Sequence, residues 1–203
     1  IVIVDAKSYC PYCEKLKKEV LNDYQGDIPL HFRYADQLEG LMIKTATWAT
    51  PTILFIENGV ESLGFQGFMA REEFYKALGA FKLGRSEAFD IAFQKGTERP
   101  FCKQYDIFKN TPDGVFIDKL SGKILFDTRD RFNSGTGWLS FTHPAKDSVT
   151  MHEDNSYGMQ RIELKSKSSG IHLGHLFPGE GPRGKDRYCI NATVLDFVPR
   201  DKS

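Results

Sequence analysis

The chain has 203 residues, 40% of them hydrophobic and 27% charged, which is typical of a folded globular protein. Basic and acidic residues balance at 27 each, which excludes a net basic field for nucleic acid and an acidic tail. No apolar run approaches the ~20 residues of a membrane span. Four cysteines over this length are too few for a small disulfide scaffold and favour a chemical use of the thiols.

The chain opens with IVIVDA, an apolar run that predicts a buried strand. Because the sequence starts at Ile1 inside this strand, we expect that an upstream segment, such as a signal peptide or a membrane anchor, has been removed.

The motif CPYC, containing Cys10 and Cys13, follows this strand and precedes a predicted helix over residues 14–22. A thiol at a helix N-terminus meets unpaired backbone N–H groups and the positive end of the dipole, both of which favour thiolate. Cys10 is therefore the predicted nucleophile, and Cys13, one turn inside the helix, is suited to resolving a mixed disulfide. Half of a zinc site is the alternative, but no second ligand pair at metal spacing occurs before residue 84.

A second strand is predicted over residues 28–35, a hairpin over 50–65 with its turn at Asn58-Gly59, and a helix over 70–81. This order, with CxxC after a strand and Thr-Pro opening a later one, resembles the thioredoxin fold over residues 1–83. The resemblance implies an α/β domain in which Pro51 is cis and faces CPYC; a trans proline opening an edge strand is the alternative. The segments ATPT and NGVESLGFQGF are similar to thioredoxin-type reductases of the bacterial envelope, which favours the periplasm or cell envelope over the cytoplasm.

Residues 84–203 form a predicted second domain, separated from the first by a joint rich in Gly, Thr and Pro. Short strands dominate it and predict a small, mainly antiparallel sheet or barrel: GVFID, KILFD, MQRIELKS, GIHLGHLF and RYCINATVLDFV.

Four motifs of this half are GTERPF at 96–101, SGTGWLSF at 134–141, HLGH at 172–175 and RYCIN at 187–191. In residue identity and in order, these motifs resemble those of the methionine-R-sulfoxide reductases of the B type (MsrB). The resemblance implies that Cys189 attacks the sulfoxide sulfur and that Trp138 packs on the S-methyl group of the substrate. It also implies a pocket lined by four polar residues: His172, His175, Arg187 and Asn191.

These residue types suit that chemistry. A sulfoxide sulfur becomes electrophilic only when its oxygen is protonated or strongly hydrogen-bonded, so a thiolate and an acid are both required. Arg187 and Asn191 each lie two residues from Cys189 on the same strand face, where the arginine can lower the thiol pKa. The two histidines would point to opposite faces of a strand unless Gly174 permits a bulge. Either histidine is a candidate acid.

Each residue also has an interpretation without catalysis. A histidine could satisfy buried backbone groups, or both histidines could bind a metal together with Cys189. Trp138 could be a core residue, and Arg187 an ordinary salt-bridge partner.

The sequence departs from the family at several positions. Many members hold a structural zinc with two CxxC pairs, and oxygen-bearing residues replace all four thiolates here: Asp118, Ser121, Ser166 and Ser169. Such ligands do not make a tight tetrahedral zinc site, so we predict a domain without metal or other cofactor. The family's acidic residue after the second histidine falls on Gly179, and Glu180 is the candidate substitute.

The family's common resolving cysteine is replaced by Thr136. Cys102 is the remaining thiol of this half and the candidate to capture a Cys189 sulfenic acid; otherwise it is a small hydrophobe. We expect reduction of methionine-R-sulfoxide, free or in proteins, through a Cys102–Cys189 disulfide that CPYC then reduces, with an external thiol reductant resetting CPYC. Two alternatives remain: a thiol oxidase or isomerase whose second domain only recognises oxidised clients, and a non-catalytic binder of oxidised methionine.

Overall fold

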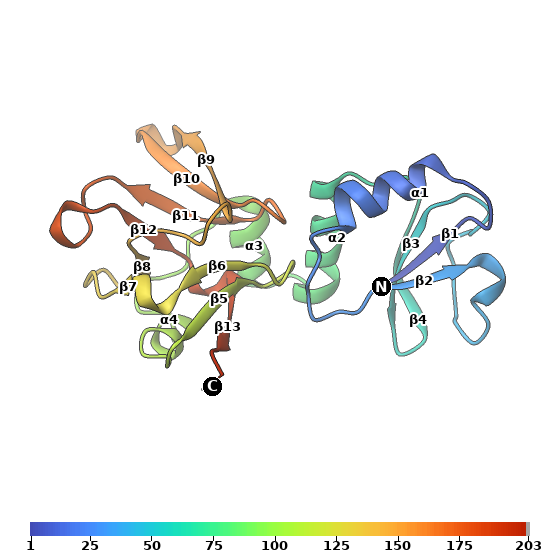
Figure 1. Ribbon diagram of the computed structural model, residues 1–203, viewed down its shortest axis with the longest axis horizontal. Helices are drawn as coiled ribbons and strands as arrows, with labels where there is room; N and C mark the ends of the chain where they lie inside the picture. Colours follow the sequence, from blue (N-terminus) through green and yellow to red (C-terminus); the bar gives the residue numbers. More distant parts are fainter. Residues whose placement is uncertain (202–203) are drawn as a thin grey trace. The chain divides into compact units, whose positions relative to one another are not determined.

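A computed structural model describes residues 1–201 (Figure 1). The chain divides into two compact units, one from Ile1 to Gly84 and one that begins at Arg85. Within the described residues, no helix is both long and apolar enough to cross a membrane.

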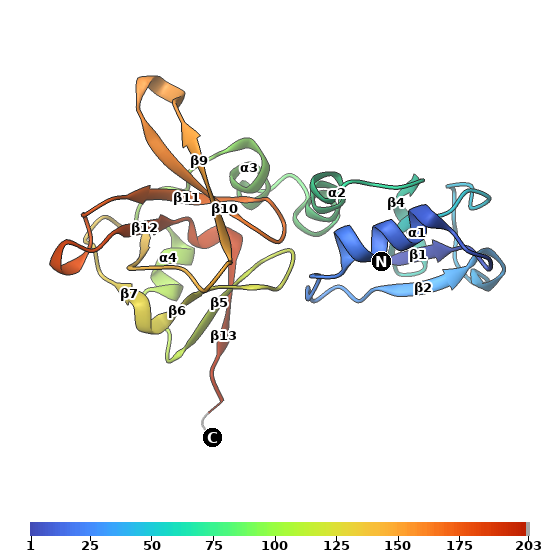
Figure 2. The ribbon, with the colours of Figure 1, turned by 45° about the horizontal axis from the view of Figure 1, so that its top comes forward.

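The first unit is a four-stranded sheet with two helices. In the order β2-β1-β3-β4, β1 (Val2–Asp5) is parallel to β2 (His31–Tyr34) and antiparallel to β3 (Thr52–Glu57), which pairs with β4 (Val60–Gln66). Helix α1 (Pro11–Leu16) continues into a π-helical turn, Lys17–Leu21, and lies beside α2 (Arg71–Leu83) (Figures 1 and 2).

Successive side chains of β3 point to opposite faces of the sheet, so this strand contributes core residues to both faces. Phe55 is fully buried, and its ring contacts those of Phe74 and Phe81 in α2 at centroid distances of 6.2 and 5.4 Å. Leu54 points to the other face, where it packs with the valines of β1. The predicted α/β architecture is confirmed, but α1 begins at Pro11 rather than at residue 14 because Cys10 caps it.

The second unit contains two antiparallel sheets and two helices, α3 (Glu87–Gln94) and α4 (Lys103–Phe108). The larger sheet has the order β7 (Arg131–Phe132), β8 (Leu139–Phe141), β12 (Arg187–Ile190), β11 (His172–Phe177), β10 (Arg161–Ser166) and β9 (Val149–Asp154). The smaller sheet has the order β13 (Leu195–Pro199), β5 (Gly114–Asp118) and β6 (Ile124–Asp127).

A core of aromatic rings joins the two sheets. Phe141 of β8 stacks on Phe126 of β6 at 4.4 Å and meets Phe116 of β5 edge-on at 5.5 Å. The predicted antiparallel β architecture is confirmed. One predicted strand is wrong, because a 3-10 turn at Ala192–Val194 divides RYCINATVLDFV into β12 and β13, which belong to different sheets. Strands β7 and β8 are too short to show a period-two pattern in the sequence.

Candidate functional site

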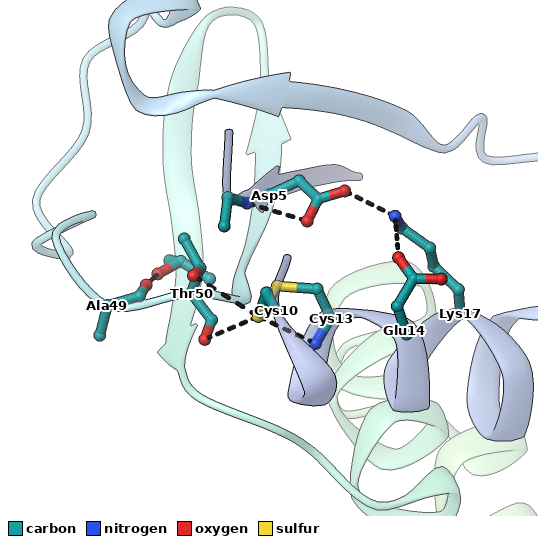
Figure 3. The surroundings of a disulfide bond; sticks show 9 residues. Asp5, Cys10, Cys13, Glu14, Lys17, Ala49 and Thr50 are labelled. Atoms are coloured by element: carbon teal, nitrogen blue, oxygen red, sulfur yellow. Dashed lines mark hydrogen bonds and ion pairs between the residues drawn. A yellow bond between two sulfur atoms is a disulfide. The ribbon is translucent and has the colours of Figure 1, made fainter. Parts of the chain in front are cut away.

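The CPYC pair lies at the start of α1 (Figure 3). Cys10 and Cys13 are joined by a disulfide, and the Cys13 backbone N–H donates to the Cys10 sulfur at 3.2 Å. Cys10 is partly exposed, whereas Cys13 is buried. This asymmetry suits Cys10 to attack and Cys13 to resolve.

The segment before β3 covers the Cys10 sulfur. The Thr50–Pro51 peptide bond is cis, the isomer that the thioredoxin resemblance implies. Both the hydroxyl and the carbonyl oxygen of Thr50 lie 3.7 Å from Cys10 Sγ (Figure 3). Three aromatic side chains of these two segments, at 83, 62 and 83% exposure, give the first unit an accessible apolar surface that the motif alone did not reveal: Tyr9, Tyr12 and Trp48.

The second thiol site is a cavity of about 180 Å³ formed largely by the facing strands β11 and β12. Cys189 in β12 is directly opposite His175 in β11 and Ser140 in β8. Five residues predicted from the MsrB motifs line the cavity: Trp138, His175, Arg187, Cys189 and Asn191. His172 does not line it.

A bulge in β11 brings both histidines to one side of the sheet. The register against β10 shifts between Leu164, opposite Gly174, and Lys165, opposite His172, so β11 has one extra residue. The two imidazole rings consequently meet at 5.3 Å. Only glycine fits at position 174, because a Cβ there would lie 1.9 Å from the Cys189 carbonyl oxygen.

Each histidine has its own carboxylate partner. His172 Nδ1 is 2.8 Å from Glu163, and its Nε2 is buried without a hydrogen-bond partner in the described structure. Burial lowers the pKa of His172, and Glu163 only partly opposes this effect. His172 is therefore the buried member of the pair, and His175 is the member that reaches the cavity.

Asp154, the last residue of β9, is the partner of His175. Its Oδ2 lies 2.7 Å from His175 Nε2 and 3.0 Å from an Arg161 guanidinium nitrogen, while its Oδ1 accepts from the backbone and hydroxyl of Ser156. Hydrogen bonds from Ser156 and His175 hold the pKa of this carboxyl well below its usual range. Asp154 therefore remains a carboxylate beside the cavity.

Arg187 opposes, but does not overcome, the effect of burial on Cys189. Burial raises the pKa of the Cys189 thiol, while the charge and hydrogen bond of Arg187 lower it. The guanidinium donates to Glu180 at 2.8 Å and lies 4.3 Å from the centre of the Phe177 ring. The predicted lowering effect of Arg187 is therefore present, but burial outweighs it because a pocket that excludes water destabilises thiolate.

Asn191 connects two segments of the chain beside the cavity by hydrogen bonds. Its amide nitrogen donates to the Leu173 carbonyl at 3.0 Å, and its amide oxygen accepts from the Glu98 backbone at 3.0 Å. The Glu98 carboxylate in turn accepts from the backbone of Ala192 and Thr193. The Glu98 carbonyl also accepts from the Trp138 indole at 3.1 Å, so the GTERPF segment fixes the position of the tryptophan.

Cys102 caps α4, where its sulfur accepts from the Tyr105 backbone at 3.4 Å. The preceding Phe101 donates its backbone N–H to Gly137 at 2.8 Å, which places this segment against the loop that contains Thr136. Cys102 and Cys189 are both free thiols. Burial raises the pKa of Cys102 as well.

The four positions of the family's zinc ligands form a buried network of hydrogen bonds. Asp118 accepts from the backbone of Leu120 and Ser121 through one oxygen and from the Ser169 hydroxyl at 2.5 Å through the other. Ser168 bridges the Ser121 and Ser166 hydroxyls at 2.6 and 3.1 Å. These residues do not fit zinc, because the one carboxylate is saturated and the remaining ligands would be hydroxyls. Among the described residues, no group of three or more His, Cys, Asp or Glu side chains is arranged to hold a metal.

Sequence reasoning missed three polar residues around the cavity: Asp154, Arg161 and Glu163. A signal for two of them was present, because Arg161 and Glu163 alternate with Ile162 and Leu164 in RIELKS and so share one face. Asp154 gave no such signal, since its position depends on the pairing of β9 with β10, where it lies opposite Arg161.

Two family models match the chain. The model described as a SelR domain matches residues 85–199, more than half of the chain, and the model described as a Thioredoxin-like domain matches residues 1–82. The SelR domain indicates peptide-methionine (R)-S-oxide reductase activity. With a redox-capable cysteine pair in one unit and the Cys189 cavity in the other, the chain belongs to the SelR (MsrB) family and bears a thioredoxin-like domain on its N-terminal side.

Proposed function

We propose that Cys189 reduces the R epimer of methionine sulfoxide and that the CPYC pair of the same chain supplies the electrons. The observation that carries this proposal is the placement of the Cys189 thiol opposite His175, in a cavity whose wall includes Trp138. Thiolate, acid and an apolar surface for a methyl group are the three groups that the reduction needs.

In the first step, Cys189 thiolate attacks the sulfoxide sulfur while His175 gives a proton to the sulfoxide oxygen. The oxygen is transferred to Cys189, so methionine leaves reduced and Cys189 becomes a sulfenic acid. The Asp154 carboxylate, 2.7 Å from His175 Nε2, holds the imidazole in position for this step.

In the second step, Cys102 thiolate attacks the sulfenic sulfur, a disulfide with Cys189 forms, and the oxygen departs with protons as water. Support for Cys102 comes from Thr136 at the usual resolving position and from the Phe101–Gly137 hydrogen bond beside it. Cys10 thiolate then attacks this disulfide, which forms a mixed disulfide with Cys10 and releases one thiol. Cys13 thiolate attacks the Cys10 sulfur of the mixed disulfide and releases the second thiol. The products are two free thiols in the SelR domain and a Cys10–Cys13 disulfide, which an external thiol reductant must reduce.

The test is turnover of the separate R and S epimers of N-acetyl-methionine sulfoxide amide with dithiothreitol as reductant. We expect reduction of the R epimer only, and none by Cys189→Ser. Normal turnover in that variant, or preference for the S epimer, would contradict the assignment. Cys10→Ser/Cys13→Ser protein should retain the first turnover, since its SelR domain still holds two thiols.

A further inference from the structure

Arg161 lines the Cys189 cavity, yet the proposed reaction gives its guanidinium no direct part. It is the first residue of β10, which pairs with β11, and β11 pairs with β12. Arg161, His175 and Cys189 therefore come from three successive strands of one sheet, and all three line the same cavity. A ligand seated against the thiol and the imidazole shares this cavity with the guanidinium.

The protein uses only part of the hydrogen-bonding capacity of Arg161. Its Nη2 donates to Oδ2 of Asp154 at 3.0 Å and to the Ser156 hydroxyl at 3.2 Å. Its Nε is buried and has no hydrogen-bond partner within residues 1–201. A buried N–H group without an acceptor is unfavourable, and more so when the group is charged. An acceptor atom of a ligand in the cavity would remove this penalty.

The other arginine of the cavity, Arg187, is engaged in a different way. Its guanidinium donates to Glu180 at 2.8 Å and lies over the Phe177 ring. Its charge and hydrogen bond lower the pKa of the Cys189 thiol. Arg187 thus acts on the nucleophile, whereas the unpartnered donor belongs to Arg161, on the other side of the histidine strand.

We propose that Arg161 binds the oxygen of the sulfoxide through its Nε–H group and is a further catalytic residue of the reaction. This inference deepens the function proposed for Cys189 and rests on it. A sulfoxide oxygen carries partial negative charge, which grows as thiolate adds to the sulfur, and a positively charged donor stabilises it. Because a guanidinium does not give up its proton, the proton still comes from His175. Arg161 holds the oxygen, and His175 protonates it.

The same contact distinguishes substrate from product. Methionine has no oxygen on its sulfur, so the Arg161 Nε–H loses its acceptor when the reduction is complete. The hydrogen bond therefore favours binding of the sulfoxide over binding of the sulfide, and its loss favours release of the reduced product.

The test compares binding of two ligands that differ by this oxygen. The R epimer of N-acetyl-methionine sulfoxide amide and N-acetyl-methionine amide are each titrated calorimetrically into Cys189→Ser protein, which cannot react. In the Arg161→Lys background, a methylene replaces the Nε–H group while the positive charge beside Asp154 is kept. Kd for the sulfoxide should weaken by about tenfold to a hundredfold, and Kd for the sulfide should not change.

The matched control is Arg129→Lys, the same change at an exposed arginine of the SelR domain that does not line this cavity. It should alter neither Kd. With Cys189 present, the single-turnover rate of Arg161→Lys at saturating sulfoxide should fall at least tenfold, because the lost donor faces the oxygen that gains charge. If the wild-type chain did not reduce the sulfoxide, the proposed function would fail while the two titrations still judged Arg161. Equal weakening for sulfoxide and sulfide, or a sulfoxide Kd equal to that of Arg129→Lys, would overturn the assignment of the oxygen to Arg161.

Discussion

His175 Nε2 lies 2.7 Å from Oδ2 of Asp154, although the two residues belong to strands separated by β10. Glu163, Arg161 and His172 surround this pair from β10 and β11, and Cys189 and Arg187 face it from β12. Since Asp154 is a carboxylate, it accepts a hydrogen bond from the Nε2–H group of His175. Nδ1 is then the ring atom of His175 that can exchange a proton with a ligand.

Asp154→Asn should therefore slow the reaction while the hydrogen bond to His175 persists. The amide oxygen can still accept from Nε2, but it lacks the negative charge that the carboxylate places beside the proton donor. We expect the single-turnover rate of methionine formation to fall by about tenfold to a hundredfold, with KM unchanged.

The matched control is Glu153→Gln, which removes an exposed carboxylate one residue away. It should leave the single-turnover rate unchanged. Asp154→Glu restores the charge and should recover part of the rate. An unaltered single-turnover rate in Asp154→Asn would show that the charge of Asp154 has no part in the proton transfer.

Asp154 should also make the stability of the SelR domain dependent on pH. Its pKa is lower in the folded state than the value of about 3.9 in unfolded chains, so the folded state binds fewer protons. The contribution is complete above about pH 5 and is lost as pH falls through the unfolded and then the folded pKa. The difference in unfolding free energy between wild type and Asp154→Asn should accordingly shrink from pH 6 to pH 2. Trp138 fluorescence in a Trp48→Phe background measures it.

Site residues that belong to a local motif could be predicted from the sequence. Those whose position depends on the pairing of distant strands could not. CPYC and RYCIN place each thiol by its immediate neighbours, and Gly174 signalled the bulge that brings the histidines together. Asp154 was missed because only the β9–β10 pairing brings it to Arg161 and, beyond that strand, to His175. The effect of Arg187 on the Cys189 thiol could be predicted because the two residues are close in the sequence, whereas the larger, opposing effect of burial on the thiol pKa depends on the whole pocket.

Arg187 and Glu180 should shift the reactivity of Cys189 in opposite directions. Arg187 lowers the thiol pKa, so Arg187→Met should move the pH midpoint of alkylation by iodoacetamide upward. Glu180 raises that pKa and also pairs with the guanidinium, so Glu180→Gln should move the midpoint downward. The measurement uses Cys10→Ser/Cys13→Ser/Cys102→Ala protein, in which Cys189 is the one remaining thiol. Shifts of the same sign in both variants would contradict the electrostatic account.

The buried network around Asp118 should make zinc unnecessary for folding. Elemental analysis of the purified chain should find no stoichiometric zinc, and chelators should not change its stability. Asp118→Ala should destabilise the SelR domain by about 2–4 kcal/mol, because two backbone N–H groups and the Ser169 hydroxyl lose their acceptor in the interior. One zinc per chain would contradict this prediction and revive a site at His172, His175 and Cys189.

Cys102 should be the thiol that connects the two reactive centres. One equivalent of R-sulfoxide added to fully reduced Cys10→Ser/Cys13→Ser protein should consume two thiols, and peptide mapping should show a Cys102–Cys189 disulfide. Because burial raises the pKa of Cys102, the disulfide should form faster as pH rises. The rate of thiol loss after rapid mixing measures this step.

Cys102→Ala separates the relay from the chemistry that precedes it. The first turnover should survive, since Cys189 alone attacks the sulfoxide, while steady turnover through CPYC should fall at least tenfold because no disulfide is presented to Cys10. Small thiols should partly restore turnover by attacking the sulfenic acid directly. Normal steady turnover in Cys102→Ala, together with a Cys10–Cys189 disulfide trapped in Cys13→Ser/Cys102→Ala protein, would show that CPYC resolves the sulfenic acid itself and that Cys102 only caps its helix.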